Sequence, residues 1–401
     1  MSQVLGATAK KNQYGEHLSL HCWTGEVARC TPEIAALRLL APEGADAAAD
    51  PEKWLFLDTE TTGLAGGSGT YAFLVGVAWW DGGGLEIEQF FMRECSEERS
   101  LLLALAERIA ERSVLVTFNG KSFDWPLLET RYRMSRRIPV PSLRAHLDFL
   151  HSARNLWRLR LGSVKLSQLE RHVLGWDRGA DRVSETIPQA YLDFVRGGSP
   201  ERLVPVFNHN QMDLRGLAAL SGRVLSLLSD AENVGQDGLE LFGVSQICER
   251  RGESGRARKL YEKSIASSLP VETDRSARRS LARIAKREGD FDAACEHWKS
   301  ALGNSRHGYE AYRQLAIYHE HTASDPERAL QVVQQALNEL RRAYEMGDLL
   351  PRPYRELKDR FEHRKLRLER KRRKSMPELR WGTAGNCEGD DDTSQIELRR
   401  L

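Results

Sequence analysis

The chain has 401 residues, enough for two domains and a tail, and 41% of them are apolar, which permits a sizeable core. The charged fraction of 29% is slightly above average and fits a soluble protein, whereas the formal net charge of +2 says little because the charges are unevenly placed. We expect no membrane span, because no run of about 18 apolar residues exists, and no signal peptide, because the first residues lack an apolar stretch. The six cysteines have no C-x-x-C spacing and predict reduced thiols in a cytoplasmic protein.

Strand and helix patterns begin after an N-terminal extension at residues 1–50, which holds a short apolar element and an Ala/Asp-rich linker. Apolar runs predict strands at residues 54–60, 71–80, 85–92, 114–119 and 145–151. Helices are predicted at residues 97–113, from residue 123, and through most of 165–228. Early strands followed by helices predict an α/β domain at residues 51–230, with a mixed five-stranded sheet flanked by helices.

Residues 236–345 show recurring pairs of helical segments. Each pair carries a small alanine with an apolar residue about four positions later, and the alanines are Ala257, Ala294 and Ala329. Their spacings of 37 and 35 residues are close to the tetratricopeptide period of about 34. We therefore predict an all-α tetratricopeptide-like repeat domain. The Trp and first Tyr of the repeat consensus are missing, so an ordinary helical bundle is the alternative.

The tail at residues 346–401 is biased in charge. Residues 351–374 hold 12 Lys or Arg against four acids, whereas residues 375–401 hold six acids against three basic residues. This pattern predicts a basic helix followed by a disordered acidic tail.

The segment FLDTETTGL places Asp58 and Glu60 two residues apart at the end of a predicted buried strand. Side chains at positions i and i+2 of a strand point to the same face, so the two carboxylates emerge together. Like charges this close repel unless a cation lies between them, and oxygen ligands suit Mg²⁺ or Mn²⁺. Two solvated acids at a polar strand end are the alternative.

Two further segments carry acids. TFNGKSFDWPLLETR places Asn119 after a strand and Asp124 at a helix start, where a carboxylate also serves as an ordinary helix cap. FNHNQMDLRGLAAL places His209 and Asp213 four residues apart, on one face of a predicted helix. A histidine there can orient or deprotonate a water, or it can simply lie on a polar surface.

In this order the motifs resemble those of the DEDD-type 3′–5′ exonucleases of the ribonuclease-H-like superfamily. The finer resemblance is to the YprB-like bacterial subfamily. It rests on DTETTGLAGGSGTYAFLVG, HLDFLH, LWRLRLGSVKLSQLE and HNQMD, and it covers roughly residues 50–225.

The resemblance implies hydrolysis of phosphodiester bonds by a two-metal-ion mechanism with Mg²⁺ or Mn²⁺. It assigns Asp58 to both ions, Glu60 and Asp213 to one of them, and Asp124 to the other. It also places Glu60 near the terminal 3′-hydroxyl and gives His209 the role of water-orienting base. The spacing of His209 from Asp213 is that of the family's tyrosine branch, so the sequence leaves the role of His209 open.

Candidate substrate contacts surround these acids. Residues 131–171 hold ten Lys or Arg against two acids, which fits a single-strand binding surface or a solvated basic face. The candidate contacts are Thr61, Thr62, Gly63, Asn119, Trp157, Arg158 and Arg160. Asp148 is either an acid that supports the metal ligands from behind or a polar residue with its hydrogen bonds satisfied.

The leading functional hypothesis is a nuclease that acts from the 3′ end of single-stranded DNA or RNA. A second hypothesis is a non-catalytic adaptor that binds nucleic acid and recruits a protein partner through its helical repeats. A third is a different ribonuclease-H-like activity, such as endonucleolytic cleavage. No membrane partner is expected.

Overall fold

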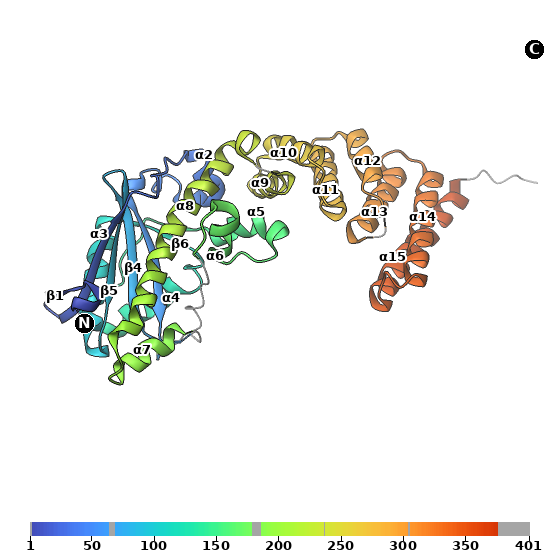
Figure 1. Cartoon of the computed structure of the whole chain (residues 1–401). Coiled ribbons are helices and arrows are strands. Elements are labelled where there is room, and N and C mark those ends of the chain that lie inside the picture. The colour runs from blue at the N-terminus through green and yellow to red at the C-terminus, as the bar shows by residue number, and fades with distance from the viewer. Residues whose placement is uncertain (1, 64–68, 179–185, 236, 304, 376–401) are drawn as a thin grey trace, which may run out of the picture. The chain divides into compact units, whose positions relative to one another are not determined.

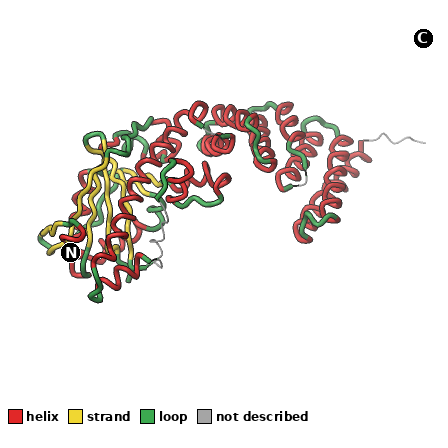
Figure 2. Tube along the Cα trace, viewed as in Figure 1, coloured by secondary structure: helices red, strands yellow, loops and turns green. Residues whose placement is uncertain are grey.

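The computed structural model describes residues 2–63, 69–178, 186–235, 237–303 and 305–375, so the predicted acidic tail lies outside the described residues. The chain divides into two compact units, Met1–Ile284 and Ala285–Leu401. Within the described residues, the strands gather in the first unit and the second unit is helical (Figure 2). No helix in these ranges is both long and apolar enough to cross a membrane.

A seven-stranded mixed sheet forms the centre of the first unit (Figure 1). Its strands are β1 (Thr8–Asn12), β2 (Gly15–Thr24), β3 (Trp54–Thr61), β4 (Ala72–Asp81), β5 (Gly84–Phe91), β6 (Val114–Thr117) and β7 (Ala145–Asp148). They lie in the order β1-β2-β5-β4-β3-β6-β7. β3, β6 and β7 run parallel, and the other neighbours pair antiparallel. The carboxyl end of β3 therefore lies at the same edge as the ends of β6 and β7.

The predicted mixed sheet with flanking helices is confirmed, and β1 and β2 add two strands to the five that were expected. Both come from the N-terminal extension, and β2 pairs with the whole length of β5. β1 is an exposed, Lys-containing edge strand, which hides it from a search for apolar runs. The half-buried β2 completes the sheet beside β5.

Helices cover both faces of this sheet. Along β3, Trp54 and Phe56 join one apolar core while Leu55 and Leu57 join the other, as the alternation of a strand requires. The first core is closed by α2 (Ile34–Leu40), α5 (Leu150–Leu161) and α8 (Val204–Val234). The second is closed by α3 (Glu98–Glu111), α4 (Asp124–Ser135) and α7 (Ile187–Val195). The short helices α1 (Ser2–Leu5) and α6 (Leu166–Leu169) complete this part.

The remaining helices continue the first unit and build the second. They are α9 (Gly238–Arg250), α10 (Ser254–Ala266), α11 (Val271–Arg287), α12 (Phe291–Ser300), α13 (Arg306–His321), α14 (Pro326–Glu345) and α15 (Pro351–Ser375). The three alanines that suggested a repeat, Ala257, Ala294 and Ala329, lie in α10, α12 and α14 and are fully buried. Their burial fits close helix contacts, and the tetratricopeptide assignment stays a prediction.

The basic run of the tail forms α15, which packs against the rest of the second unit through a buried acid. Glu320 of α13 is 4% exposed and pairs with Arg364, at 3.1 Å, and with Arg367. Part of the positive charge of α15 is therefore used inside the fold. Other arginines of this helix, including Arg360 and Arg370, are exposed.

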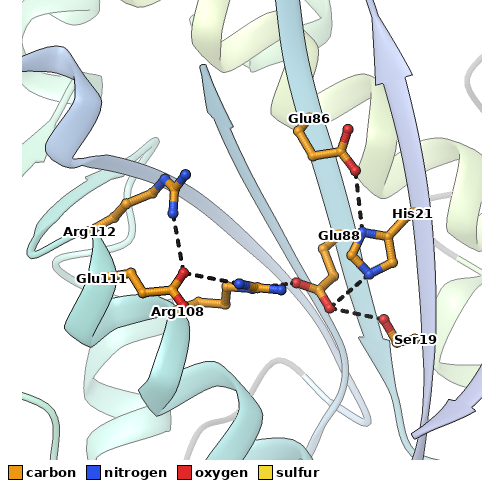
Figure 3. Close-up of polar contacts among 7 residues, drawn as sticks. All are labelled: Ser19, His21, Glu86, Glu88, Arg108, Glu111 and Arg112. Carbon is orange, nitrogen blue, oxygen red and sulfur yellow. Dashed lines mark hydrogen bonds and ion pairs between the residues drawn. The ribbon is translucent and has the colours of Figure 1, made fainter. Parts of the chain in front are cut away.

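A polar network ties β2 to β5 and α3 (Figure 3). The Glu88 carboxylate is 4% exposed, accepts from Ser19 at 3.0 Å and Arg108 at 2.7 Å, and lies 3.0 Å from His21 Nε2. Arg108 also donates to Glu111 on the exposed side of α3. Because these partners come from three elements, the network joins the N-terminal strands to the domain.

We expect Glu88→Ala to lower the free energy of unfolding of the first unit by roughly 2–4 kcal/mol, because it leaves Arg108 without a buried partner. Thermal unfolding followed by tryptophan fluorescence measures this. Glu111→Ala is the matched control: its side chain is 50% exposed, and its loss should cost at most about 1 kcal/mol. Equal effects of the two substitutions would contradict this account of the network.

Candidate active site

The first pair of predicted acids continues one face of β3. Trp54 and Phe56 face the core beneath α8, so Asp58 and Glu60, next in the same alternation, lie on the α8 side of the strand. Glu60 is 9% exposed. The pairing of β3 with β4 shifts register between Glu60 and Thr61, the last residue of the strand. The predicted common face of the two carboxylates follows from this arrangement.

Helix α8 brings the third motif to the same place. Asn210 of α8 donates from Nδ2 to Oδ2 of Asp58 at 2.8 Å, which fixes the helix against the strand end. One turn on, Asp213 lies 3.5 Å from Nε2 of His209. His209 is only 7% exposed, so it is a buried neighbour of Asp213 rather than a residue on a polar surface.

Asp124 is the first residue of α4, and Thr59 connects it to β3. The Thr59 hydroxyl, on the opposite side of the strand from Asp58, donates to Oδ1 of Asp124 at 2.6 Å. Burial raises the pKa of Asp124 to about 6, and the hydrogen bond from Thr59 opposes the rise. Asp124 is thus held at the strand end in a setting that disfavours its charge.

Asp148, at the end of β7, organises the loop that leads to Asp124. Its carboxylate accepts backbone N–H groups from Asn119 at 2.9 Å, Lys121 at 3.0 Å and Leu150 at 3.0 Å. Asn119 has a left-handed backbone with φ +74°, a conformation that needs such support. Asp148 therefore lies behind the candidate site and positions its loop.

The acids at the strand end repel one another. The pKa of Asp58 lies well above its usual value, with burial as the largest cause. Three neighbouring carboxylates add to the rise: Asp213, Glu60 and Asp124. The hydrogen bond from Asn210 acts in the opposite direction. Each carboxylate of the predicted set thus lies close enough to Asp58 to oppose its ionisation.

A guanidinium contacts one of these acids. Arg178 donates to Oδ1 of Asp213 at 2.5 Å and pairs with Glu170, which is 1% exposed. Glu170 lies against Gly216 of α8, where an added Cβ would approach Oε1 to 1.6 Å, so only glycine admits this carboxylate. The arginine is therefore anchored from behind while it neutralises Asp213.

The donor set fits a hard divalent cation by its chemistry, because all four side chains offer carboxylate oxygens and three of them raise the pKa of the fourth. Across the described ranges, however, no three His, Cys, Asp or Glu side chains already stand as a ready-made metal site. Oδ1 of Asp213 is paired with Arg178, so this oxygen becomes open to an ion only when the carboxylate turns from the arginine. The residues therefore suit the ion, and a side-chain movement would complete the site.

Six of the seven candidate substrate contacts are exposed or partly exposed. Thr61, Thr62 and Gly63 lie partly exposed beside the strand end, and the Thr62 hydroxyl accepts the N–H of Tyr71 at 3.0 Å. Asn119 lies in the loop held by Asp148. Arg158 is exposed on α5.

Trp157 and Arg160 are placed differently from the prediction. Trp157 is 0% exposed, and its indole N–H donates to buried Glu240 at 2.7 Å, so it does not offer its ring to a base. Arg160 donates to Asp237 at 2.8 Å. Both residues attach α5 to α9, because α5 turns its apolar side, which includes Leu156, towards this core. The substrate contact predicted for Trp157 is therefore corrected to a packing role.

Sequence reasoning missed four residues around the acids. Thr59, Asn210 and Arg178 each contact a predicted metal ligand, and Phe123, directly before Asp124, is 58% exposed. Phe123 carried a readable signal, since a large aromatic residue stands beside a candidate ligand. The contacts of Asn210 and Arg178 depend on residues distant in sequence and had no such signal.

Comparison with known proteins agrees with this arrangement. Residues 55–225 match the RNase H superfamily. The chain is 32% identical over 287 residues to the uncharacterized protein YprB of Bacillus subtilis (strain 168), covering 71% of this chain and 69% of YprB. The chain belongs to the YprB family.

YprB itself is described as uncharacterized, so the family carries no established activity with it. The RNase H superfamily domain places this chain with proteins that are typically nucleases and generally use divalent metal ions. A family B DNA polymerase from the archaeon Pyrobaculum calidifontis is also similar over 50% of this chain, with 16% identity and a TM-score of 0.35. The match spans 29% of that polymerase.

The raised pKa of Asp124 predicts a pH dependence of stability in the absence of metal. A folded-state pKa of about 6, above the ordinary value, means that the folded chain holds a proton that the unfolded chain has lost. The corresponding stability is present at low pH and is lost as the pH rises through about 6.

We expect Asp124→Asn to weaken this dependence, because Asp58 with its raised pKa retains a contribution of the same sign, and to stabilise the metal-free first unit at pH 7.5 by roughly 1–3 kcal/mol. Thermal unfolding in EDTA across pH 4.5–7.5 tests it, with Glu107→Gln, an exposed acid on α3, as the matched control. Wild-type stability that stays level or rises across this window, with no difference in Asp124→Asn, would contradict the prediction.

Proposed function

We propose that this chain is a metal-dependent 3′–5′ exonuclease that hydrolyses phosphodiester bonds of single-stranded nucleic acid. The observation that carries the proposal is the set of carboxylates around Asp58, whose pKa is raised first by burial and further by the charge of these three acids. A protein that needed these acids only for folding would gain stability by replacing some of them. A cation-binding role explains why they stand together.

In this proposal Asp58, Glu60, Asp124 and Asp213 hold two Mg²⁺ or Mn²⁺ ions. When bound, the ions would supply charge neutralisation at the scissile phosphate and activation of a water. Asp58 is central, because each of the other acids acts on it. Thr59 and Asn210 fix the orientations of Asp124 and Asp58 through their hydrogen bonds.

His209 is proposed to orient the attacking water and to accept its proton. Its Nε2 lies 3.5 Å from Asp213, so the ring stands beside a candidate ligand on the same face of α8. Glu60 is proposed to contact the terminal 3′-hydroxyl from the strand end. These roles account for a histidine that is almost fully buried yet adjacent to an acid.

The 3′ end is proposed to enter over the segment Thr61–Gly63 and the loop of Asn119. Phe123 offers an exposed ring one residue before Asp124, where a base can stack. The exposed Arg158 offers positive charge for the sugar–phosphate backbone farther along the strand. The helical region at residues 236–345 would add a protein-binding surface.

One observation favours the alternative of a nucleic-acid-binding adaptor without catalysis. Arg178 already neutralises Asp213. Glu170, which packs against Gly216, pairs with Arg178 and holds it in this position. If this pairing persists when metal is present, the chain lacks one ligand and would bind nucleic acid without cutting it. The same experiment separates the two functions.

The test uses the purified full chain with single-stranded DNA and RNA labelled at either the 3′ or the 5′ end. With Mn²⁺ or Mg²⁺ we expect a ladder shortened from the 3′ end one nucleotide at a time, and no product in EDTA. Asp58→Asn should lower the rate by more than about 100-fold because a shared ligand is lost. Thermal unfolding of this variant should show an intact fold.

Glu107→Gln on α3 makes the same acid-to-amide change away from the site and should leave the rate unchanged. Internal cuts would indicate an endonuclease instead. Strands that bind but remain uncut with every metal would support the adaptor and overturn the exonuclease proposal.

A further inference from the structure

Three residues on adjacent strands lie in one row beneath α8. Asp58 of β3 is directly opposite Gly76 of β4, and Gly76 is directly opposite Gln89 of β5. Residues opposite one another in a sheet share a face, so Asp58 and Gln89 flank a position without a side chain. The row is therefore open at its middle, on the side where α8 packs.

Asn210 of α8 fills this opening. Its Nδ2 donates to Oδ2 of Asp58 at 2.8 Å, and its Oδ1 accepts from Nε2 of Gln89 at 2.8 Å. The same Nε2 donates to the carbonyl of Phe207 at 3.0 Å, and Gln211 donates to Oε1 of Gln89 at 2.8 Å. Asn210 is 0% exposed and Gln89 is 1% exposed.

These contacts fix which way each amide points. Because Gln89 receives a hydrogen bond on its oxygen, its nitrogen must face Asn210. Because Asn210 receives that donor on Oδ1, its own nitrogen must face Asp58. The orientation of the Asn210 amide, which donates to Asp58, is thus determined by the hydrogen bonds of Gln89.

Gly76 is required for this geometry. A Cβ at this position would lie 2.0 Å from Oδ1 of Asn210 and 2.8 Å from Cδ1 of Leu214. Any side chain would therefore push the amide off the row. An alanine here would disturb the contact to Asp58 without removing a hydrogen-bonding group.

We propose that Gln89 and Asn210, seated over Gly76, form a relay that positions the Asp58 carboxylate for a divalent cation. The inference rests on the proposed function, which assigns Asp58 to metal binding. Asp58 stands among three other acids and would otherwise turn away from their charges. The relay holds Oδ2 of Asp58 and would leave its other carboxylate oxygen for the cation. All members of the relay are positioning residues.

A relay that only stabilised the fold would change the melting temperature and leave metal affinity unchanged. The decisive readout is therefore the dissociation constant for Mn²⁺, measured by isothermal titration calorimetry on the full chain without substrate. Thermal unfolding in EDTA is measured in parallel. Neither readout depends on nuclease activity.

We expect Gly76→Ala to weaken Mn²⁺ binding by roughly 10–100-fold, the range for supporting contacts behind metal ligands. Gln89→Met keeps the side-chain volume and removes the donor, and Asn210→Leu keeps the approximate volume and cannot donate to Asp58. Both should weaken binding similarly. Gly255→Ala on α10 is the matched control, because its added Cβ would meet nothing within 4 Å.

If Gly76→Ala does not fold, Gln89→Met and Asn210→Leu decide the question. Folded variants that bind Mn²⁺ as tightly as the wild type overturn the relay, even where their melting temperatures fall, and leave the proposed function intact. A wild-type chain that binds no Mn²⁺ overturns the proposed function, and the relay with it.

Discussion

Mutual repulsion among carboxylates at the end of β3 is the constraint on which this site depends. Three acids oppose the ionisation of Asp58, and burial increases the penalty. Such a cluster costs folding free energy unless protons, a basic side chain or a cation offset the charge. The structure contains one such offset in Arg178, which contacts Asp213, and another in the donors that reach Asp58 and Asp124.

The surrounding fold is arranged around these offsets. Two glycines make room for polar side chains where α8 approaches its neighbours: Gly76 admits the amide of Asn210, and Gly216 admits the carboxylate of Glu170. On the opposite side, Asp148 gathers the backbone of the loop before Asp124. Close backbone approach at the two glycines lets α8 carry polar side chains beside the acids. Three of the four candidate metal ligands, Asp58, Asp124 and Asp213, thus have a side-chain hydrogen-bond donor.

Local patterns were sufficient for the mixed sheet and for the common face of Asp58 and Glu60, because strand alternation determines both. They failed for β1, whose lysines and exposed edge position lack the apolar signature of a core strand. They also failed for Trp157, where neighbouring arginines suggested a binding surface although Leu156 and Ala153 mark the buried side of α5. Asn210 lies 152 residues from Asp58 and 121 from Gln89, so only the folded chain reveals that contact.

The most direct test of the central claim is a crystal structure of the full chain grown with Mn²⁺, with the ions located by anomalous scattering. The account predicts Mn²⁺ beside Asp58, with the Asp213 carboxylate turned from Arg178 towards an ion. Absence of Mn²⁺ at this strand end at millimolar concentration, with Asp213 still paired to Arg178, would contradict it. The carboxylates would then form a binding surface without metal chemistry.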